Sequence, residues 1–451
     1  MLGVVVSRAD EASVHIGEHL LDLADWETPD DDPGEGAGGD AVYRTEGAEL
    51  REFDDRHLDL ERPADAFGDL DLLVFASKHA GDTGRLLTAH HTGNLGPADH
   101  GGEPNALARA APNAHATVVD ALDRHAPADY DVGVECTHHG PTDVGAPSLF
   151  VEVGSGPEEW AEPAAAAAVA RAILDLREVA PDRPVEAGAD RRRHLVGLGG
   201  GHYAPRFERV IRETEWAVGH VAADWGLEAM PDPENDAGRA VLDATFEQSA
   251  ADYALVAGER PDLETAVRNL GYRPVSETWV RETSGVPLRV VEAVEADLGT
   301  IESGVRFGAR ASAGHETFER VDLSSDLVET ACGIDQARTR EALATHAVAF
   351  ETTDGGSRPT GPVALVDADD REAVIAGLAD VLRDRFDEVR REGEALVARE
   401  TAFVPEKAKT LGVPEGPTCG RLAAGERVEV DGREIPPEAV REEREVRFPC
   451  R

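Results

Sequence analysis

Short apolar runs alternate with amphipathic segments from the start of the chain to Leu270, and this alternation is the strongest constraint on the fold. The apolar runs have the length and composition of buried strands: Leu2–Val6, Asp71–Ala76, Leu86–Ala89, Asp131–Glu135, Leu149–Val153, His194–Leu198 and Ala254–Ala257. The amphipathic segments are typical of helices: a segment that ends at Leu23, then Asn105–His125, Glu158–Arg177, Pro205–Ala217, Ala240–Ala251 and Leu263–Leu270. Strands that alternate with helices predict an α/β fold with a mixed, mostly parallel sheet and helices on both faces.

The pattern changes after about residue 300. Only His315 and His346 lie beyond that point, the stretch Asp367–Ala398 is strongly charged and helical in pattern, and a tail rich in Pro and Gly follows it. A chain of 451 residues also exceeds the usual size of one hydrophobic core. We therefore expect a catalytic domain over residues 1–300 and a C-terminal α+β accessory region over residues 301–451. The acidic, Gly- and Pro-rich segment Glu27–Asp40 is expected to be a solvated loop.

The charge of the chain is extreme, with 89 acidic residues against 45 basic ones and a net charge of −44. Such a charge makes a compact protein repel itself and bind polyanions poorly at low salt. Molar salt removes both effects, because the Debye length there is about 3 Å. Since the acidic residues are spread along the whole chain, we interpret them as a salt-adapted, halophilic surface; a protein that binds basic partners is the alternative.

The cysteines and the N-terminus indicate a cytoplasmic protein. The four cysteines, Cys136, Cys332, Cys419 and Cys450, are widely spaced and form no CxxC pair, which fits a reducing compartment. The N-terminal residues lack the cationic start and apolar core of a signal peptide. No run of about 20 apolar residues occurs, so we expect no membrane span and no membrane partner.

Histidine is concentrated in one part of the chain, because eleven of the sixteen histidines lie between His79 and His220. They belong to short motifs, several of which directly follow predicted strands: SKHAG (77–81), HHTGN (90–94), ECTHHGPT (135–142), GGGHYAPR (199–206) and ETEWAVGH (213–220). Ligands of an open α/β sheet bind beyond the carboxyl ends of its strands. We therefore expect these motifs to form one site.

The residue types in these motifs suit metal-assisted or histidine-assisted hydrolysis. Histidine, cysteine and carboxylate are zinc ligands, and a catalytic zinc keeps one position for water. Such a zinc lowers the pKa of its water to about 7. Histidine can instead act as a general base toward water without a metal. The glycines 199–201 allow close approach of the backbone to a ligand, and their amides can bind a phosphate or an oxyanion.

The individual histidines differ in how specific their signal is. His202, which follows three glycines, is the strongest single candidate. Neighbouring side chains on an extended segment point in opposite directions, so one of His138 and His139 can coordinate while the other packs. A cysteine such as Cys136 is more often a small buried apolar residue than a ligand or nucleophile. His79, His90 and His91 suit a structural role as well as a functional one, whereas the positions of His100, His115 and His125 favour a structural role.

Several motifs together resemble those of a known family: SRAD (7–10), SKHA, HTGN, ECTHHGPTD, PSLFVEVGS, GGGHYAPRF and ETEWAVGH. In this order, from residue 1 to about residue 300, they resemble the archaeal and plant-type D-aminoacyl-tRNA (D-tyrosyl-tRNA) deacylases, in a haloarchaeal-like form with a C-terminal extension. The resemblance implies hydrolysis of the ester between a D-amino acid and the 3′ adenosine of tRNA, and also of glycine mischarged on alanine tRNA. It implies zinc as cofactor, the acceptor end of aminoacyl-tRNA as partner, and a fold related to peptidyl-tRNA hydrolase and nucleoside phosphorylase. We expect a monomer.

Carried over to this sequence, the resemblance suggests three sets of residues. The expected catalytic residues are His138, His139 and His202. The zinc ligands are expected among Cys136, His138, His139, His202, His79, His91 and Glu135. The expected substrate contacts are Gly199, Gly200, Gly201, Tyr203, Arg206, Asn94 and Arg8.

Alternatives remain for the chain and for its tail. A phosphorylase-like or peptidase-like hydrolase is compatible with the same fold, and so is a zinc- or tRNA-binding module without catalysis. The segment Leu411–Val440 is similar to part of the tRNA 3′-processing ribonuclease family. That similarity suggests a tRNA-directed accessory element, and a packed structural extension is the alternative. The sequence shows no clear basic face for tRNA.

Overall fold

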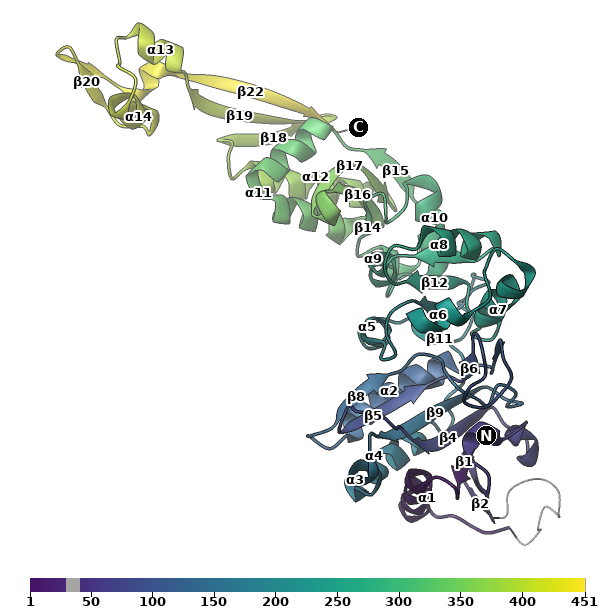
Figure 1. The fold of residues 1–451 in the computed structure, drawn as a ribbon. Coiled ribbons are helices and arrows are strands. Elements are labelled where there is room, and N and C mark those ends of the chain that lie inside the picture. Colours follow the sequence, from purple (N-terminus) through teal and green to yellow (C-terminus); the bar gives the residue numbers. More distant parts are fainter. Residues whose placement is uncertain (30–40, 451) are drawn as a thin grey trace. The chain divides into compact units, whose positions relative to one another are not determined.

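The computed structural model describes residues 1–29 and 41–450 as two compact units, Met1–Ser284 and Gly285–Arg451 (Figure 1). The boundary lies before the position near residue 300 at which the sequence pattern changes, because helix α10 (Leu288–Asp297) already belongs to the second unit. Most of the expected loop Glu27–Asp40, namely residues 30–40, lies outside the described residues. Among the described residues, every helix is too short or too polar to span a membrane.

The first unit contains a seven-stranded sheet in the order β2-β3-β1-β4-β9-β5-β8. Its strands are β1 (Leu2–Ser7), β2 (Ala41–Thr45), β3 (Ala48–Phe53), β4 (Leu72–Lys78), β5 (Leu86–His90), β8 (Asp131–Val134) and β9 (Ser148–Gly154). All neighbouring pairs are parallel except β2 with β3 and β5 with β9. Consequently β5 and β8 run in the direction opposite to β1, β4 and β9.

Helices form a layer over one face of this sheet. They are α1 (Glu11–Leu23), α2 (Pro112–His125), α3 (Pro157–Trp160) and α4 (Pro163–Leu174). Helix α1 begins where the carboxylate of Asp10 accepts hydrogen bonds from the amides of Ala12 and Ser13. The other face carries an apolar cluster around Phe75 and Phe150, which is closed by the short 3-10 segments η1 (His57–Asp59) and η2 (Pro63–Ala66).

A second, fully parallel sheet in the same unit has the order β11-β10-β12-β13. Its strands are β10 (His194–Leu198), β11 (Ala217–Ala222), β12 (Tyr253–Val256) and β13 (Arg273–Val275). Helices α7 (Asp236–Glu247) and α8 (Pro261–Asn269) pack on one face, and α5 (Pro205–Glu213) and α9 (Glu277–Glu282) pack on the other. Helix α2 contacts both β5 and β11 and so joins the two sheets. The short pair β6 (Gly93–Asn94) and β7 (Ala106–Leu107) and helix α6 (Asp224–Ala229) complete the unit.

The second unit is an α+β structure. Its antiparallel sheet β14-β16-β17-β15 packs against two long helices, and a further sheet has the order β18-β19-β22. The elements are β14 (Val305–Phe307), η3 (Ala311–Ala313), β15 (Glu319–Asp322), α11 (Ser325–His346), β16 (Ala349–Thr353), η4 (Asp354–Gly356), β17 (Arg358–Leu365), α12 (Ala368–Leu382), β18 (Glu388–Glu392), β19 (Ala395–Phe403) and β22 (Arg441–Pro449).

A small module lies beyond the ends of β19 and β22 within this unit (Figure 1). It contains α13 (Pro405–Thr410), α14 (Pro417–Ala423), β20 (Val428–Val430), β21 (Arg433–Ile435) and η5 (Pro437–Val440). Its own apolar core includes Ala408, Leu422 and Val440. We call residues 404–440 the distal module.

The predicted α/β class, the large mostly parallel sheet, the flanking helices and the α+β extension are confirmed. All seven predicted strands are present within two residues of their expected ends. The helix expected at Asn105–His125 begins only at Pro112, and the one expected at Pro205–Ala217 ends at Glu213. The helical prediction for Asp367–Ala398 is wrong after Leu382, because the charged alternation there forms the hairpin β18–β19.

Candidate active site

The histidine motifs meet over the middle of the seven-stranded sheet. His79 follows β4, His90 ends β5, and Glu135 follows β8. Because β5 and β8 run opposite to β4, these residues do not gather at a common carboxyl edge. Glu152 of β9 lies between them, since it is in register with Ser77 of β4 and with Thr88 of β5.

His79 is held by two buried carboxylates. Its Nδ1 lies 3.2 Å from Glu135 Oε1 and 3.7 Å from Glu152 Oε2, and its Nε2 lies 2.9 Å from the hydroxyl of Tyr203. Burial by itself would lower the pKa of His79, but hydrogen bonds with the two carboxylates raise it to about 11. The His79 ring is therefore a protonated imidazolium, and its positive charge is neutralised by Glu135 and Glu152.

His202 reaches the same carboxylate from the second sheet. The amide of Cys136 donates a 2.8 Å hydrogen bond to the carbonyl of His202, so the loop after β8 pairs with the loop after β10. The His202 side chain is about one-third exposed, and its Nε2 donates a 2.7 Å hydrogen bond to Glu135 Oε2. Its Nδ1 lies 3.7 Å from Cys136 Sγ. Burial, together with the Glu135 charge, raises the pKa of the Cys136 thiol to about 12.

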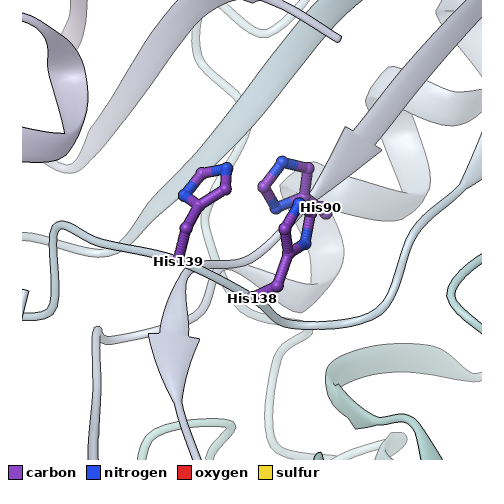
Figure 2. Close-up of side chains that lie close together, drawn as sticks. All are labelled: His90, His138 and His139. Carbon is purple, nitrogen blue, oxygen red and sulfur yellow. The ribbon is translucent and has the colours of Figure 1, made fainter. Parts of the chain in front are cut away.

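His90, His138 and His139 form a cluster of three imidazoles (Figure 2). The ring centroids of His90 and His138 lie 4.3 Å apart, those of His138 and His139 lie 4.3 Å apart, and those of His90 and His139 lie 4.9 Å apart. Each Nδ1 faces a backbone carbonyl at 2.7–3.1 Å and must donate a proton to it. Burial followed by nearby imidazoles lowers the pKa of His138, and it lowers that of His139 to about 4. These two rings are therefore neutral at pH 7, with a lone pair on Nε2.

Metal-ligand atoms converge in three groups, each with its atoms within 4.8 Å of one another: His90–His138–His139, Cys136–His138–His202 and His79–Glu135–Glu152. His138 belongs to two of them. One buried atom in these groups, His90 Nε2, makes no hydrogen bond within the described part of the chain and lies 3.7 Å from Glu152 Oε1, whereas Glu135 Oε1 faces His79 Nδ1 at 3.2 Å. Imidazole and thiol groups beside buried carboxylates are ligand types that fit a cation.

The cluster opens into a pocket of about 690 Å³. His79, His138, His139 and His202 line it on one side. The remaining lining residues are Ala9, Asp10, Arg56, His57, Leu58, Ser77, Lys78, Ala80, Asn94, Pro97, Asp99, His100, Phe150, Glu152 and Trp225. A concave pocket of this volume with converging ionisable groups has the size of a small-molecule site.

The structure brings most of the predicted site residues together. Cys136, His138, His139, His202, His79 and Glu135 all belong to the donor groups. Asn94 lines the pocket, where its amide donates to the carbonyls of Gly101 and Glu103, and Tyr203 reaches the pocket through His79.

His91 does not join the expected zinc ligands, because it belongs to none of the donor groups found among the described residues. Its Nδ1 faces the carbonyl of Gly219 at 3.1 Å, and its ring packs near His115 and His220. Its neighbour His90 occupies the cluster instead. Successive side chains on an extended segment point to opposite sides, so only one of this pair can join the imidazole cluster.

Two predicted arginine contacts are engaged elsewhere. Arg8 pairs with Glu52 at 3.0 Å and with Asp54 at 2.8 Å. Arg206 pairs with Glu277 at 3.2 Å. Neither lines the pocket, so the expectation that they contact tRNA from this site is not supported by the geometry.

The three glycines also differ from expectation. The amide of Gly199 donates to the carbonyl of Ala222 at 2.7 Å, and the amide of Gly200 donates to the carboxylate of Asp224 at 2.6 Å. Both amides already have acceptors in the protein, and Gly201 does not line the pocket. The φ angles of Gly199 and Gly200, 99° and 95°, explain why glycine stands at these positions.

Three site residues were missed by sequence reasoning, namely His57, Glu152 and Asp10, and His90 was considered as a candidate but left out of the expected ligands. Asp10 caps α1 and also accepts hydrogen bonds from the Ser77 hydroxyl at 3.2 Å and the Lys78 amide at 3.1 Å. The alternation of Phe150 and Glu152 along one strand would have placed a carboxylate on the same face as the phenyl ring. An acidic residue inside an otherwise apolar strand was the available signal.

Comparisons with known proteins agree with one another. Residues 66–274 match the family model for D-aminoacyl-tRNA deacylase. The chain is 54% identical to the D-aminoacyl-tRNA deacylase of Haloarcula marismortui, over 99% of this chain and all of the relative. It is 51% identical to that of Natronomonas pharaonis over 99% of this chain and all of the relative, and 32% identical to that of Methanoregula boonei over 97% of this chain and 96% of the relative.

One solved structure is also similar. It is the crystal structure of a conserved protein of unknown function, AF0625, with a TM-score of 0.54 and 28% sequence identity. The similarity covers 63% of this chain and 98% of that chain. The mixed α/β architecture is therefore shared with an experimentally determined structure.

Proposed function

The chain belongs to the D-aminoacyl-tRNA deacylase family, and from this premise we propose that its pocket hydrolyses the ester of D-aminoacyl-tRNA. Water adds to the ester carbonyl, the bond to the ribose oxygen breaks, and a D-amino acid and free tRNA leave. The reaction removes D-amino acids before they enter translation. Glycine mischarged on alanine tRNA is a second substrate, because glycine has no side chain to exclude.

The observation that carries this proposal is the contact between His202 and Glu135. With Nε2–H donated to the buried carboxylate at 2.7 Å, the lone pair of His202 is on Nδ1, and the carboxylate stabilises the ring when it takes up a proton. His138, whose ring centroid lies 4.7 Å from that of His202, offers a second neutral imidazole to the pocket. When the pair holds no metal, one of these histidines takes the proton from water and returns it to the leaving ribose oxygen; when both are zinc ligands, their lone pairs are committed to the metal.

Zinc is the cofactor that we propose. The donor set Cys136–His138–His202 has three ligands of the types that zinc prefers, which leaves a position for water. The neighbouring set His90–His138–His139 consists of imidazoles alone and shares His138. A bound zinc would lower the pKa of its water to about 7 and so supply hydroxide at neutral pH. Glu135 orients His202 for this role just as it does for proton transfer.

Selection of the D-enantiomer follows from a steric clash in the pocket. We attribute this selection to exclusion of an L side chain by the pocket. A built-in clash discriminates more strongly than a preference for one methylene group.

We further propose that the enzyme acts as a monomer in the cytoplasm at high salt. The net charge of −44 supports salt adaptation, since molar salt reduces the Debye length to about 3 Å and removes repulsion between the chain and tRNA. Counterion release contributes little under such conditions, so recognition must rely on shape, stacking and hydrogen bonds.

The test is single-turnover deacylation of D-tyrosyl-tRNA and L-tyrosyl-tRNA by the wild type, His202→Ala and His125→Ala. We expect the wild type to favour the D-substrate and His202→Ala to be slower by about 10²- to 10⁴-fold. His125, which pairs with Asp175 on the surface, is the matched control and should keep the wild-type rate. Equal rates on both enantiomers would refute the chirality claim, and an unchanged His202→Ala rate would refute the assigned site. Binding of zinc and tRNA without turnover would favour a binding module.

A further inference from the structure

Trp225 is an aromatic side chain left open to solvent at the rim of the candidate active site. It is 49% exposed and lines the pocket together with His138 and His202. The other four tryptophans are placed differently. Trp216 and Trp279 are fully buried, and the indole N–H groups of Trp26 and Trp160 donate to the carbonyls of Leu20 and His79. An exposed indole at the rim of a pocket offers a flat aromatic face on which a planar group can stack.

The helix that carries Trp225 is fixed at both ends. At the start of α6, the Asp224 carboxylate accepts hydrogen bonds from the amide of Gly200 at 2.6 Å and from Arg260 at 2.7 Å. At its end, a Cβ atom on Gly96 would lie 2.6 Å from the carbonyl oxygen of Ala229, so that backbone contacts the loop after β6 directly. The indole is therefore presented on a rigid support, which lowers the entropic cost of binding.

The glycines 199–201 therefore have a positioning role, which differs from the phosphate binding expected from the sequence. Gly200 precedes the pocket histidine His202 by two residues and holds Asp224, which precedes Trp225 by one. The same loop sets the position of the reacting imidazole and of the exposed indole. A ligand that contacts both His202 and Trp225 would span the two positions that this loop sets.

We propose that Trp225 is the stacking platform for the terminal adenine base of the tRNA acceptor end. This inference rests on the proposed function, in which the reacting ester sits on the ribose of that nucleotide. The base is then one sugar away from the carbonyl that faces His138 and His202. Leu58 and Pro97 also line the pocket and add apolar surface to it.

The charge of the chain favours an uncharged contact of this kind. With a net charge of −44, the protein repels phosphates at low salt, and at high salt phosphate contacts are screened. Base–aromatic stacking does not depend on charge and contributes to the binding of single-stranded ends in many proteins. Stacking on Trp225 therefore supplies affinity that the acidic surface does not.

The first experiment measures binding of adenosine 5′-monophosphate alone by titration calorimetry. We compare the wild type with Trp225→Ala, Trp225→Phe and Leu23→Ala, where Leu23 is an exposed side chain on α1. Trp225→Ala should weaken binding about 10- to 100-fold, Trp225→Phe should keep most of it, and Leu23→Ala should match the wild type. Far-UV circular dichroism checks that the variants fold. Equal affinity of the wild type and Trp225→Ala would overturn the proposal, whether or not the protein deacylates tRNA.

The second experiment separates the base from the amino acid. For Trp225→Ala we expect KM for D-tyrosyl-tRNA to rise about 10- to 100-fold with kcat little changed, because ground state and transition state lose the same contact. Hydrolysis of D-tyrosine ethyl ester, which has no base, should stay at the wild-type rate. An equal loss on both substrates would place the amino-acid side chain on Trp225 and would also overturn the proposal. Absence of hydrolysis by the wild type would count against the proposed function and leave the nucleotide titration decisive for Trp225.

Discussion

The two units of the chain use ionisable residues in opposite ways. The first unit holds all but two of the sixteen histidines, and it buries Glu135 and Glu152 beneath them. In the second unit, arginines and glutamates alternate on the sheet β18-β19-β22 and face solvent, as with Arg399 and Glu445 at 3.0 Å or Arg447 and Glu392 at 3.0 Å. Buried charges must be matched by partners of fixed geometry, whereas exposed pairs are screened and individually weak. Composition alone would not show which of the charged residues are buried.

The difference explains where chemistry can occur. In the first unit, the Glu135 carboxylate pairs with both His79 and His202, so a substitution of Glu135 changes the electrostatic environment of both rings. In the second unit, Glu445 pairs with Arg399 and Arg447 in water, and the loss of one pair leaves solvent as a substitute.

The largest effect is expected for Glu135→Gln. The amide cannot neutralise His79 or stabilise a protonated His202, so single-turnover deacylation of D-tyrosyl-tRNA should fall by about 10²- to 10⁴-fold. Glu445→Gln in the second unit is the matched control and should keep the wild-type rate. If both variants deacylate at similar rates, the buried carboxylate has no special role and the contrast between the units fails.

The next effect is a loss of stability on acidification that is confined to the first unit. Burial lowers the pKa of His194 to about 4, with Asp182 opposing and Arg192 assisting this shift. Its Nδ1 donates to the carbonyls of Ser249 and Ala250, and its Nε2 accepts from the amide of Arg183 at 2.9 Å.

The unfolded chain binds this proton from about pH 6.5 downward, but the folded chain binds it only near pH 4, so stability is lost as the pH falls through this window. Between pH 7 and pH 5 we expect a loss on the order of 2 kcal/mol from this histidine. Urea unfolding followed by tryptophan fluorescence reports on the first unit alone, because all five tryptophans lie there. His194→Gln should flatten the pH dependence, and the exposed His315 of the second unit, changed to Gln, should not. A His194→Gln curve as steep as the wild type would contradict the assignment.

A smaller effect is expected for zinc binding. His138 belongs to both candidate zinc-binding groups, so His138→Ala should weaken zinc binding at least 10-fold, as measured by competition with a chelator. His346→Ala, in α11 of the second unit, is the control and should bind zinc like the wild type. Wild-type zinc affinity in His138→Ala would remove zinc from the proposed site.

The smallest effect is expected for the exposed pairs of the second unit. Glu445→Gln should lower the midpoint of thermal unfolding slightly without added salt and leave it unchanged in molar salt, because these pairs are solvated and screened. Differential scanning calorimetry at both salt concentrations measures this. A large decrease that persists in molar salt would show that the charged alternation on this sheet is a structural network.

The strands and helices that were predicted correctly are those that can be identified from a short stretch of sequence alone. A run such as Leu72–Ala76 is apolar on both faces and is read as a buried strand without knowledge of its neighbours. The strands β2 and β3 were missed because their residues, among them Arg44 and Glu49, are charged. Glu49 is buried in the structure and is paired with Arg51 of the same strand and with Arg44 of β2, and the second pair becomes visible only when the two strands are placed side by side.

The site was predictable in part for the same reason. The motifs around Cys136 and His202 stand next to strands, so their convergence could be expected from the sequence. The choice between His90 and His91, and the presence of Glu152, depend on which face of a strand carries the donor groups. That face is set by the reversed direction of β5 relative to β9, which is a tertiary property.

The pairing of Phe403 with Arg441 at the end of β19 and β22 has a consequence for how this chain can vary. It brings the two ends of the distal module to neighbouring positions, so residues 404–440 behave toward the rest of the unit as one long loop. The entropy of closing a loop grows only with the logarithm of its length. Lengthening, shortening or exchanging this segment should therefore disturb the remaining sheet little, which makes the tip of the β19–β22 pair a natural place for grafting foreign sequence.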